Sequence, residues 1–282
     1  MKNRAPVHFW VGLLLLMQSS LVLTGWALQE PDWVRLRPNH IAMVINTALC
    51  FALVGMGFIA PIVAPGYKST LQVIVGWLVL LLPALVLLQI LARQDFGIDW
   101  YSLHAWLQDG NSQPGRMAIN TALGFMLAGL TLILLPHTQR KAVALTVQIT
   151  TFIVLILGAT GLIGYLLQLE LLYAWFANTR MALPTAVGMT LVGLGLWSIW
   201  RRTDWYRTQS HFSEDEKIAL IGAALLIVVA MTTGIAGFTF QQRALERTLA
   251  EHLPVNLNNR LTIFQAELKQ LLAKAESGAN RP

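Results

Sequence analysis

Methionine, asparagine and threonine side chains recur at a fixed spacing in this sequence, and they are the residue types best suited to bind a ligand. Amides and hydroxyls donate and accept hydrogen bonds, and methionine thioethers can bind Cu(I). A copper site that includes His40 is one option, but methionine more often fills core space, so we expect no metal. The candidate ligand-binding residues are Met43, Asn46, Thr47, Met117, Asn120, Thr121, Met181 and Thr185.

These residues belong to an internal repeat. The sequence reads MVINTALCFALVG over 43–55, MAINTALGFMLAG over 117–129 and MALPTAVGMTLVG over 181–193. The first two copies agree at nine of thirteen positions and the last two agree at seven. Because methionine, threonine and glycine recur at the same offsets, apolar composition alone does not explain the match. In the third copy Pro184 replaces the asparagine and removes a helix donor.

On a helix of about 100° per residue, each copy has a polar face and a separate face of small residues. The small face lets helix backbones approach closely, which is how helices associate in lipid. It contains Ala48, Gly55, Ala122, Gly129, Ala186 and Gly193. The polar face needs hydrogen-bond partners. Two interpretations stay open: the asparagines join neighbouring helices, or the three polar faces line a ligand pocket on the axis of the repeat.

Motifs typical of enzymes and ion-driven transporters are absent from the sequence. It has no H-E-x-x-H, G-x-S-x-G or Walker loop, and its six histidines are scattered over loops and helix ends. No charged residue lies in the middle of an expected span, whereas pumps and proton-coupled transporters place charges there. The single cysteine, Cys50, gives no disulfide framework. We therefore expect no enzyme activity and no cofactor.

The elements that carry the repeat are expected to be membrane helices. Of 282 residues, 55% are apolar and only 12% are charged, against roughly a quarter charged in soluble domains. About 20 apolar residues cross a bilayer. Seven such runs cover 7–28, 39–64, 69–91, 117–135, 142–167, 181–200 and 217–238. We expect an all-α membrane protein in which an N-terminal helix precedes three parallel hairpins, formed by the second and third, fourth and fifth, and sixth and seventh spans.

The charges of the loops predict the orientation. With the N-terminus inside, nine lysine and arginine residues lie in cytoplasmic loops and five lie in the opposite loops. This bias places the N-terminus in the cytoplasm and the C-terminal tail on the opposite side, which is the periplasm if the membrane is a bacterial inner membrane. The net charge of +6 forms no dense basic run, so we expect the lipid bilayer as the partner and no nucleic acid.

The chain divides into a transmembrane domain, 1–238, and an amphipathic helical tail, 239–282. Apolar residues in the tail recur in steps of four and three, which is heptad spacing. They are Leu257, Leu261, Phe264, Leu268 and Leu271. Because burying this stripe requires a second surface, we expect a homodimer formed through the tail or docking to a sensor domain. A helix lying on the membrane surface is the alternative.

Several segments resemble a known class of membrane regions. NTALCFALVG, RMAINTALGFMLAGL, RMALPTAVGMTLVGLGL and the stretch GYLLQLELLY over 164–173 are similar to the N-terminal multi-helix sensor region of bacterial histidine kinases and diguanylate cyclases. The segment from Gln241 resembles the start of periplasmic CHASE or Cache-like sensor domains. The resemblance implies that an output domain follows. Because the sequence has no GGDEF run, phosphoacceptor histidine box or ATP-binding motif, we expect the chain to be a fragment or truncated product.

Three functions are compatible with these features. The leading hypothesis is a sensory input module that detects a small or lipid-soluble ligand, or the state of the membrane, and transmits the signal through the seventh span and the tail. A small solute transporter or channel is the second, supported by the repeat and opposed by the lack of charge within the spans. A membrane anchor that only dimerises its partners is the third.

Overall fold

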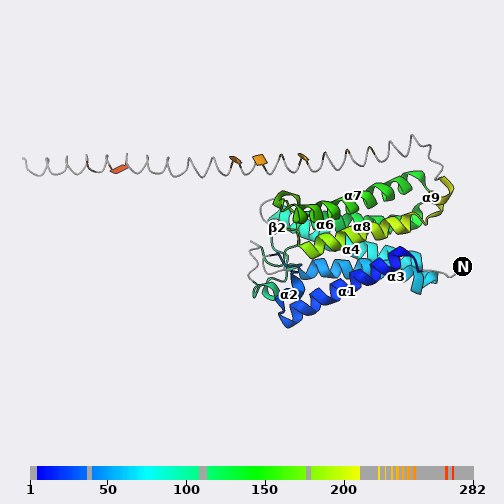
Figure 1. The fold of residues 1–282 in the computed structure, drawn as a ribbon, viewed down its shortest axis with the longest axis horizontal. Helices are drawn as coiled ribbons and strands as arrows, with labels where there is room; N and C mark the ends of the chain where they lie inside the picture. Colours follow the sequence, from blue (N-terminus) through cyan, green and yellow to red (C-terminus); the bar gives the residue numbers. More distant parts are fainter. Residues whose placement is uncertain are drawn as a thin grey trace, which may run out of the picture. The chain divides into compact units, whose positions relative to one another are not determined.

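The computed structural model describes residues 5–36, 40–107, 113–175 and 179–209, together with isolated positions between 222 and 269. The chain divides into two compact units, Met1–Ile235 and Ala236–Pro282, and the helical bundle belongs to the first. Figure 1 labels most of its elements. In chain order they are α1 (Val7–Leu28), α2 (Pro31–Val34), α3 (Ile45–Val63), η1 (Pro65–Tyr67), α4 (Lys68–Ala92), α5 (Tyr101–His104), α6 (Ile119–Leu134), η2 (Leu135–His137), α7 (Lys141–Leu166), η3 (Glu170–Leu172), β1 (Ala174–Trp175), β2 (Thr179–Arg180), α8 (Leu183–Trp200) and α9 (Asp204–Gln209).

Six helices among the described residues are long and apolar enough to cross a membrane. They are α1, α3, α4 from Ser69, α6 extended to His137, α7 and α8. The chain is therefore a mainly helical membrane protein. The expected seventh span, 217–238, and the apolar stripe of the tail lie outside the described residues, except for isolated positions such as Phe264, whose side chain is exposed.

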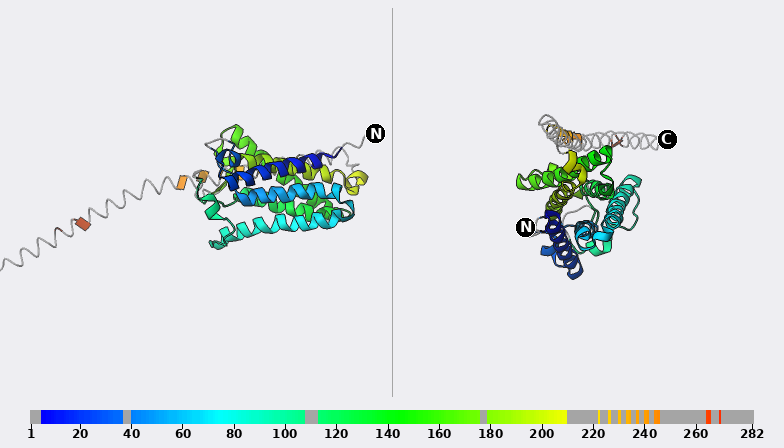
Figure 2. Two further views of the ribbon diagram at one scale, coloured as in Figure 1. Left: turned by 90° about the horizontal axis from the view of Figure 1, so that it is seen from below. Right: turned by 90° about the vertical axis from the view of Figure 1, so that its right-hand side faces the viewer.

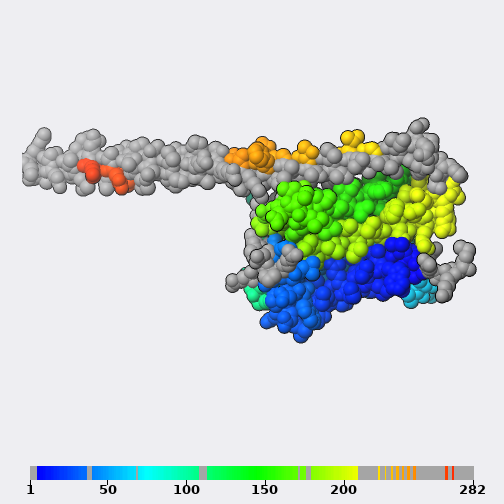
Figure 3. All heavy atoms as spheres, in the orientation of Figure 1, coloured from blue at the N-terminus to red at the C-terminus, as the bar shows by residue number. Residues whose placement is uncertain are grey.

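The six long helices form two layers around a common centre. Helices α3, α6 and α8, here called the inner helices, each contact the other two. The outer helices are α1, α4 and α7. Each packs between two inner helices: α1 against α3 and α8, α4 against α3 and α6, and α7 against α6 and α8. Figure 2 shows the bundle from one end, and Figure 3 shows α1 beside α8 on one face.

The three inner helices are the three copies of the sequence repeat, and all begin in the same register. Val44, Ala118 and Ala182, the second residue of each copy, have extended backbone and precede the first helical residue. A small cavity is lined by all three of these residues, so the inner helices start at the same end of the bundle.

Two of the expected hairpin pairs, α3 with α4 and α6 with α7, pack together, and the partner expected for α8, 217–238, lies outside the described residues except for isolated positions. Among the described helices, each inner helix packs most extensively against the outer helix that precedes it. The face of small residues explains this, because a methyl group on Gly55 would lie 2.9 Å from the carbonyl oxygen of Gly12 in α1. On Gly129 it would lie 2.7 Å from the carbonyl oxygen of Gly76 in α4. These glycines let the backbones of paired helices touch.

Large and small side chains alternate where the inner helices meet. The ring of Phe51 in α3 covers Gly188 in α8, and Met189 in α8 covers Gly124 in α6. The rings of Phe51 and Phe125 lie 4.7 Å apart in an edge-to-face arrangement. Phe51, Phe125 and Met189 are fully buried. Each side chain fills the space left by a small residue on the next helix, which closes the centre of the bundle.

Candidate functional site

The threonines of the repeat meet at the axis of the inner helices but leave little room. Thr47, Thr121 and Thr185 line a cavity of about 10 Å³, together with Met181 and other residues that precede or begin the inner helices. A space of this size holds about one water molecule. The axial ligand pocket that the sequence allowed is therefore too small for a larger ligand, because helix starts and methionine side chains occupy the space.

Asn46 and Asn120 point into the protein, and each has a backbone partner. Both are buried. The amide of Asn46 donates to the carbonyl oxygen of Gly115 at 3.3 Å, and that of Asn120 donates to the carbonyl oxygen of Tyr173 at 3.3 Å. Each asparagine thus joins an inner helix to the loop that leads into the next copy. This geometry favours the structural interpretation of the two asparagines over direct ligand contact.

The methionines of the repeat are core residues, and outer helices hold the backbone of Met43 and of Met181. Met43, Met117 and Met181 are almost completely buried. The indole of Trp26 in α1 donates to the carbonyl oxygen of Met43 at 2.8 Å, and the hydroxyl of Tyr165 in α7 donates to that of Met181 at 2.7 Å. Within the described residues, no group of three or more His, Cys, Asp or Glu side chains could hold a metal ion.

The ends of the three outer helices form three junctions with the loops, and packed aromatic rings fill the first. At the end of α1, the ring of Trp26 lies 4.2 Å from that of His104 and 5.4 Å from that of Trp106. The backbone N–H of Ile45 donates to Nε2 of His104 at 3.3 Å. These packed rings tie α1, α3 and the short helix α5 together.

The second junction, at the end of α4, is charged. Oδ2 of Asp99 accepts hydrogen bonds from the amide of Gln89 at 2.5 Å and from Nε of Arg116 at 2.8 Å. Beside this group lies a cavity of about 900 Å³, here called the polar cavity. It is lined by Leu87, Gln89, Ile90, Leu91, Arg93, Gln94, Asp95, Gln113, Arg116, Ile119 and Thr179.

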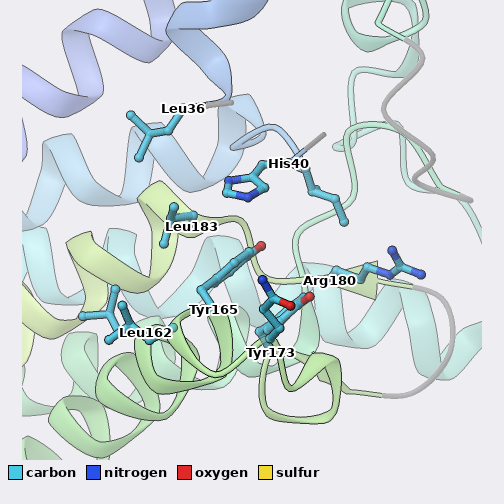
Figure 4. Close-up of a pocket in the computed structure, with 10 residues that line it drawn as sticks. Leu36, His40, Leu162, Tyr165, Tyr173, Arg180 and Leu183 are labelled. Atoms are coloured by element: carbon cyan, nitrogen blue, oxygen red, sulfur yellow. The ribbon is translucent and has the colours of Figure 1, made fainter. Parts of the chain in front are cut away.

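The third junction, at the end of α7, holds aromatic side chains beside an open cavity of about 640 Å³ (Figure 4), here called the tyrosine pocket. The rings of Tyr165 and Tyr173 are stacked, with centroids 4.1 Å apart, and the ring of His40 lies 5.4 Å from that of Tyr165. The lining residues are Leu36, His40, Ile41, Leu162, Tyr165, Leu166, Gln168, Tyr173, Arg180 and Leu183.

The polar groups of the tyrosine pocket leave it close to neutral. Nη2 of Arg180 forms an ion pair with Oε1 of Glu170 at 2.7 Å. Partial burial and the Glu170 carboxylate raise the pKa of Tyr173, so its phenol stays protonated at neutral pH. Nδ1 of His40 is buried and has no hydrogen-bond partner. The pocket therefore offers hydrogen bonding without a free charge.

No protein-family model, curated protein or solved structure matches this chain. The residues around its cavities are therefore the basis for proposing a function. Of the candidate ligand-binding residues, Met181, Thr47, Thr121 and Thr185 share the small axial cavity, and none lines the tyrosine pocket or the polar cavity.

Of the residues that line the tyrosine pocket, the sequence pointed only to His40 as a candidate ligand, and only for copper. Except for Leu183, which belongs to the third copy, the lining residues come from loops and helix ends outside the repeat, and His40 and Tyr165 lie 125 residues apart. One signal was available: Trp26 and Tyr165 both sit within the last three residues of an outer helix. An aromatic donor in this place marks where α1 and α7 each fix the start of the inner helix that follows.

Proposed function

We propose that this chain is the membrane-embedded sensory input module of a bacterial signalling protein. It binds a small or lipid-soluble ligand in the tyrosine pocket and passes a change in helix packing to the segment that follows α9. The observation that carries this proposal is the combination of an open pocket at one end of the bundle with a closed centre. Such an arrangement favours binding of a ligand over its passage across the membrane.

The packing of the centre argues against the transporter or channel alternative. Phe51, Phe125 and Met189 fill the space between the inner helices, next to glycines that leave no gap. A solute route along the axis would require these side chains to move together. Proteins that conduct or transport solutes keep polar or charged groups along the route, whereas the side chains of Phe51, Phe125 and Met189 at the centre are apolar.

Helix α8 is the element best placed to transmit a signal. It contributes Leu183 to the tyrosine pocket and Met189 to the centre. It is also the last inner helix before α9 and the expected seventh span. Packed helices switch between discrete arrangements, so a ligand that shifts the start of α8 would move the chain that follows. Three repeated helix pairs, with the seventh span added, would form the sensory domain.

The proposal also covers the membrane that holds this module, its oligomeric state and its output domain. The resemblance to bacterial signalling proteins supports a bacterial inner membrane, and the charge bias of the loops supports a cytoplasmic N-terminus and a periplasmic tail. The apolar stripe of the tail supports a homodimer. A kinase or diguanylate cyclase output would belong to a further domain, so the chain itself would not be an enzyme.

Reconstitution into liposomes separates sensing from transport. We expect the purified chain to pass no small polar or ionic solute across the bilayer, because Phe51, Phe125 and Met189 close the centre. The measurement is efflux of entrapped radiolabelled solutes, with an open porin as the positive control and empty liposomes as the negative control. Efflux above that of empty liposomes that is abolished by Phe125→Trp, which adds bulk at the axis, would support the transporter and overturn the sensory proposal.

A further inference from the structure

We infer that the tyrosine pocket binds a neutral amphiphile of the membrane quinone class, with an oxygen-bearing ring as its head and an apolar chain as its tail. This inference rests on the proposed sensory function and names the ligand class of the same site.

The walls and the mouth of the pocket suit an apolar chain. Leu36, Leu162 and Leu166 line it, and Leu36 and Leu166 are also 58% and 81% exposed at its edge. Leu167 and Leu169 continue this exposed apolar surface beyond the end of α7. In a membrane protein, an exposed apolar surface of this kind suits contact with lipid, which would let a ligand dissolved in the bilayer reach the pocket directly.

The polar side of the pocket suits a head with oxygen atoms that accept or donate hydrogen bonds. Nδ1 of His40 has no partner and can donate or accept, depending on the tautomer. The hydroxyl proton of Tyr165 is used on the Met181 carbonyl oxygen, so the hydroxyl oxygen is left as an acceptor. Figure 4 shows the His40 ring near the hydroxyl of Tyr165. A quinone carbonyl can accept from His40, and a quinol hydroxyl can donate to either group.

The charge of the pocket disfavours an ionic head. Arg180 is the only described lining residue with a permanent charge, and it is paired with Glu170. Its guanidinium points away from His40 and Leu183 in Figure 4. A fatty acid or phosphate would therefore have to compete with Glu170 for its counter-charge. The polar cavity, lined by Arg93, Asp95 and Arg116, would suit such ligands better.

The test uses the full chain in phosphatidylcholine nanodiscs and three probes. Decyl-ubiquinone has the ring and the chain, 2,3-dimethoxy-5-methylbenzoquinone has only the ring, and decanoate has a chain with an anionic head. We expect decyl-ubiquinone to raise the melting temperature saturably, the bare ring to act only at much higher concentration, and decanoate to have no effect.

Variants locate the binding. His40→Phe keeps a ring but removes the hydrogen bond, so it should weaken decyl-ubiquinone binding by about tenfold. Leu183→Trp fills the pocket and should abolish the shift. His137→Phe, at an exposed position near the other end of α6, should leave it unchanged. The melting temperatures without probe show whether each variant folds.

Each other outcome has a defined meaning. Equal stabilisation by decanoate would overturn the quinone class and leave the sensory proposal standing. No saturable shift with decyl-ubiquinone in the folded wild-type chain, or an equal shift in Leu183→Trp, would overturn the inference. The sensory proposal would fail separately, in the liposome efflux experiment.

Discussion

Replacing Gly129 by leucine should force α6 away from α4 and lower the free energy of unfolding by about 3 kcal/mol, at the upper end of overpacking costs. Even a methyl group at this position would lie 2.7 Å from both the Gly76 carbonyl oxygen and the Leu80 backbone nitrogen. Because both neighbours are backbone atoms, no change of side-chain rotamer relieves the contact. The measurement is thermal or denaturant unfolding of the purified chain in mild detergent.

Two further glycines serve as matched comparisons for this prediction. Gly55→Leu should cost a similar amount, because Gly55 meets the Gly12 backbone of α1 in the same way. Gly66→Leu should change stability little, because a methyl group at Gly66 has no heavy atom within 4 Å. Unfolding of Gly129→Leu that matches Gly66→Leu would contradict the close pairing of each inner helix with the preceding outer helix.

Replacing Asp99 by alanine should also destabilise the chain strongly, by about 3 kcal/mol, because it leaves a partly buried charge without its partner. The Asp99 carboxylate accepts hydrogen bonds from both Arg116 and Gln89. The side chains of Arg116 and Asp99 are only 17% and 9% exposed. Without the carboxylate, the guanidinium and the amide lose a common acceptor that fixes the loop before α6.

The more exposed ion pair of Arg180 and Glu170 provides the control. Its side chains are 50% and 38% exposed, so Glu170→Ala should cost less than about 1 kcal/mol. The double variant Asp99→Leu with Arg116→Met should recover part of the stability lost in Asp99→Ala, because it leaves no unpaired charge. Equal losses for Asp99→Ala and Glu170→Ala would show that the Asp99 cluster does not hold the junction.

The repeat predicted the starts of the inner helices but not the identity of their partners. All three copies have methionine at the first position and threonine at the fifth, and Val44, Ala118 and Ala182 take equivalent places between them. The small face of each copy was visible in the sequence. The surfaces that it contacts, at Gly12 and Gly76, lie outside the repeat. A small face shows that another helix comes close without showing which one, and here the preceding helix provides the contact.

The polar residues of the repeat were expected at the axis, and that placement followed from helical periodicity. The size of the cavity around them could not be predicted from periodicity, because the space that Thr121 faces depends on how tightly the three helices meet. The tyrosine pocket could not be predicted from the sequence for a different reason. Tyr173 lies in an irregular loop and packs on Tyr165 from a helix end, and loops carry no periodic pattern from which such a contact can be inferred.

Sensing requires that the tyrosine pocket and the tail be coupled, and disulfide crosslinking measures this coupling most directly. The background chain carries Cys50→Ser and Leu261→Cys, so that crosslinks form only between the tails of two chains. Leu183→Trp then fills the pocket, and Val187→Trp adds the same side chain at an exposed position one turn along α8. We expect Leu183→Trp to change the crosslinking rate by about fivefold, as for a coupling free energy of about 1 kcal/mol, and Val187→Trp to leave it unchanged. Equal rates in all three chains, including no crosslinking in any of them, would contradict a sensory input module.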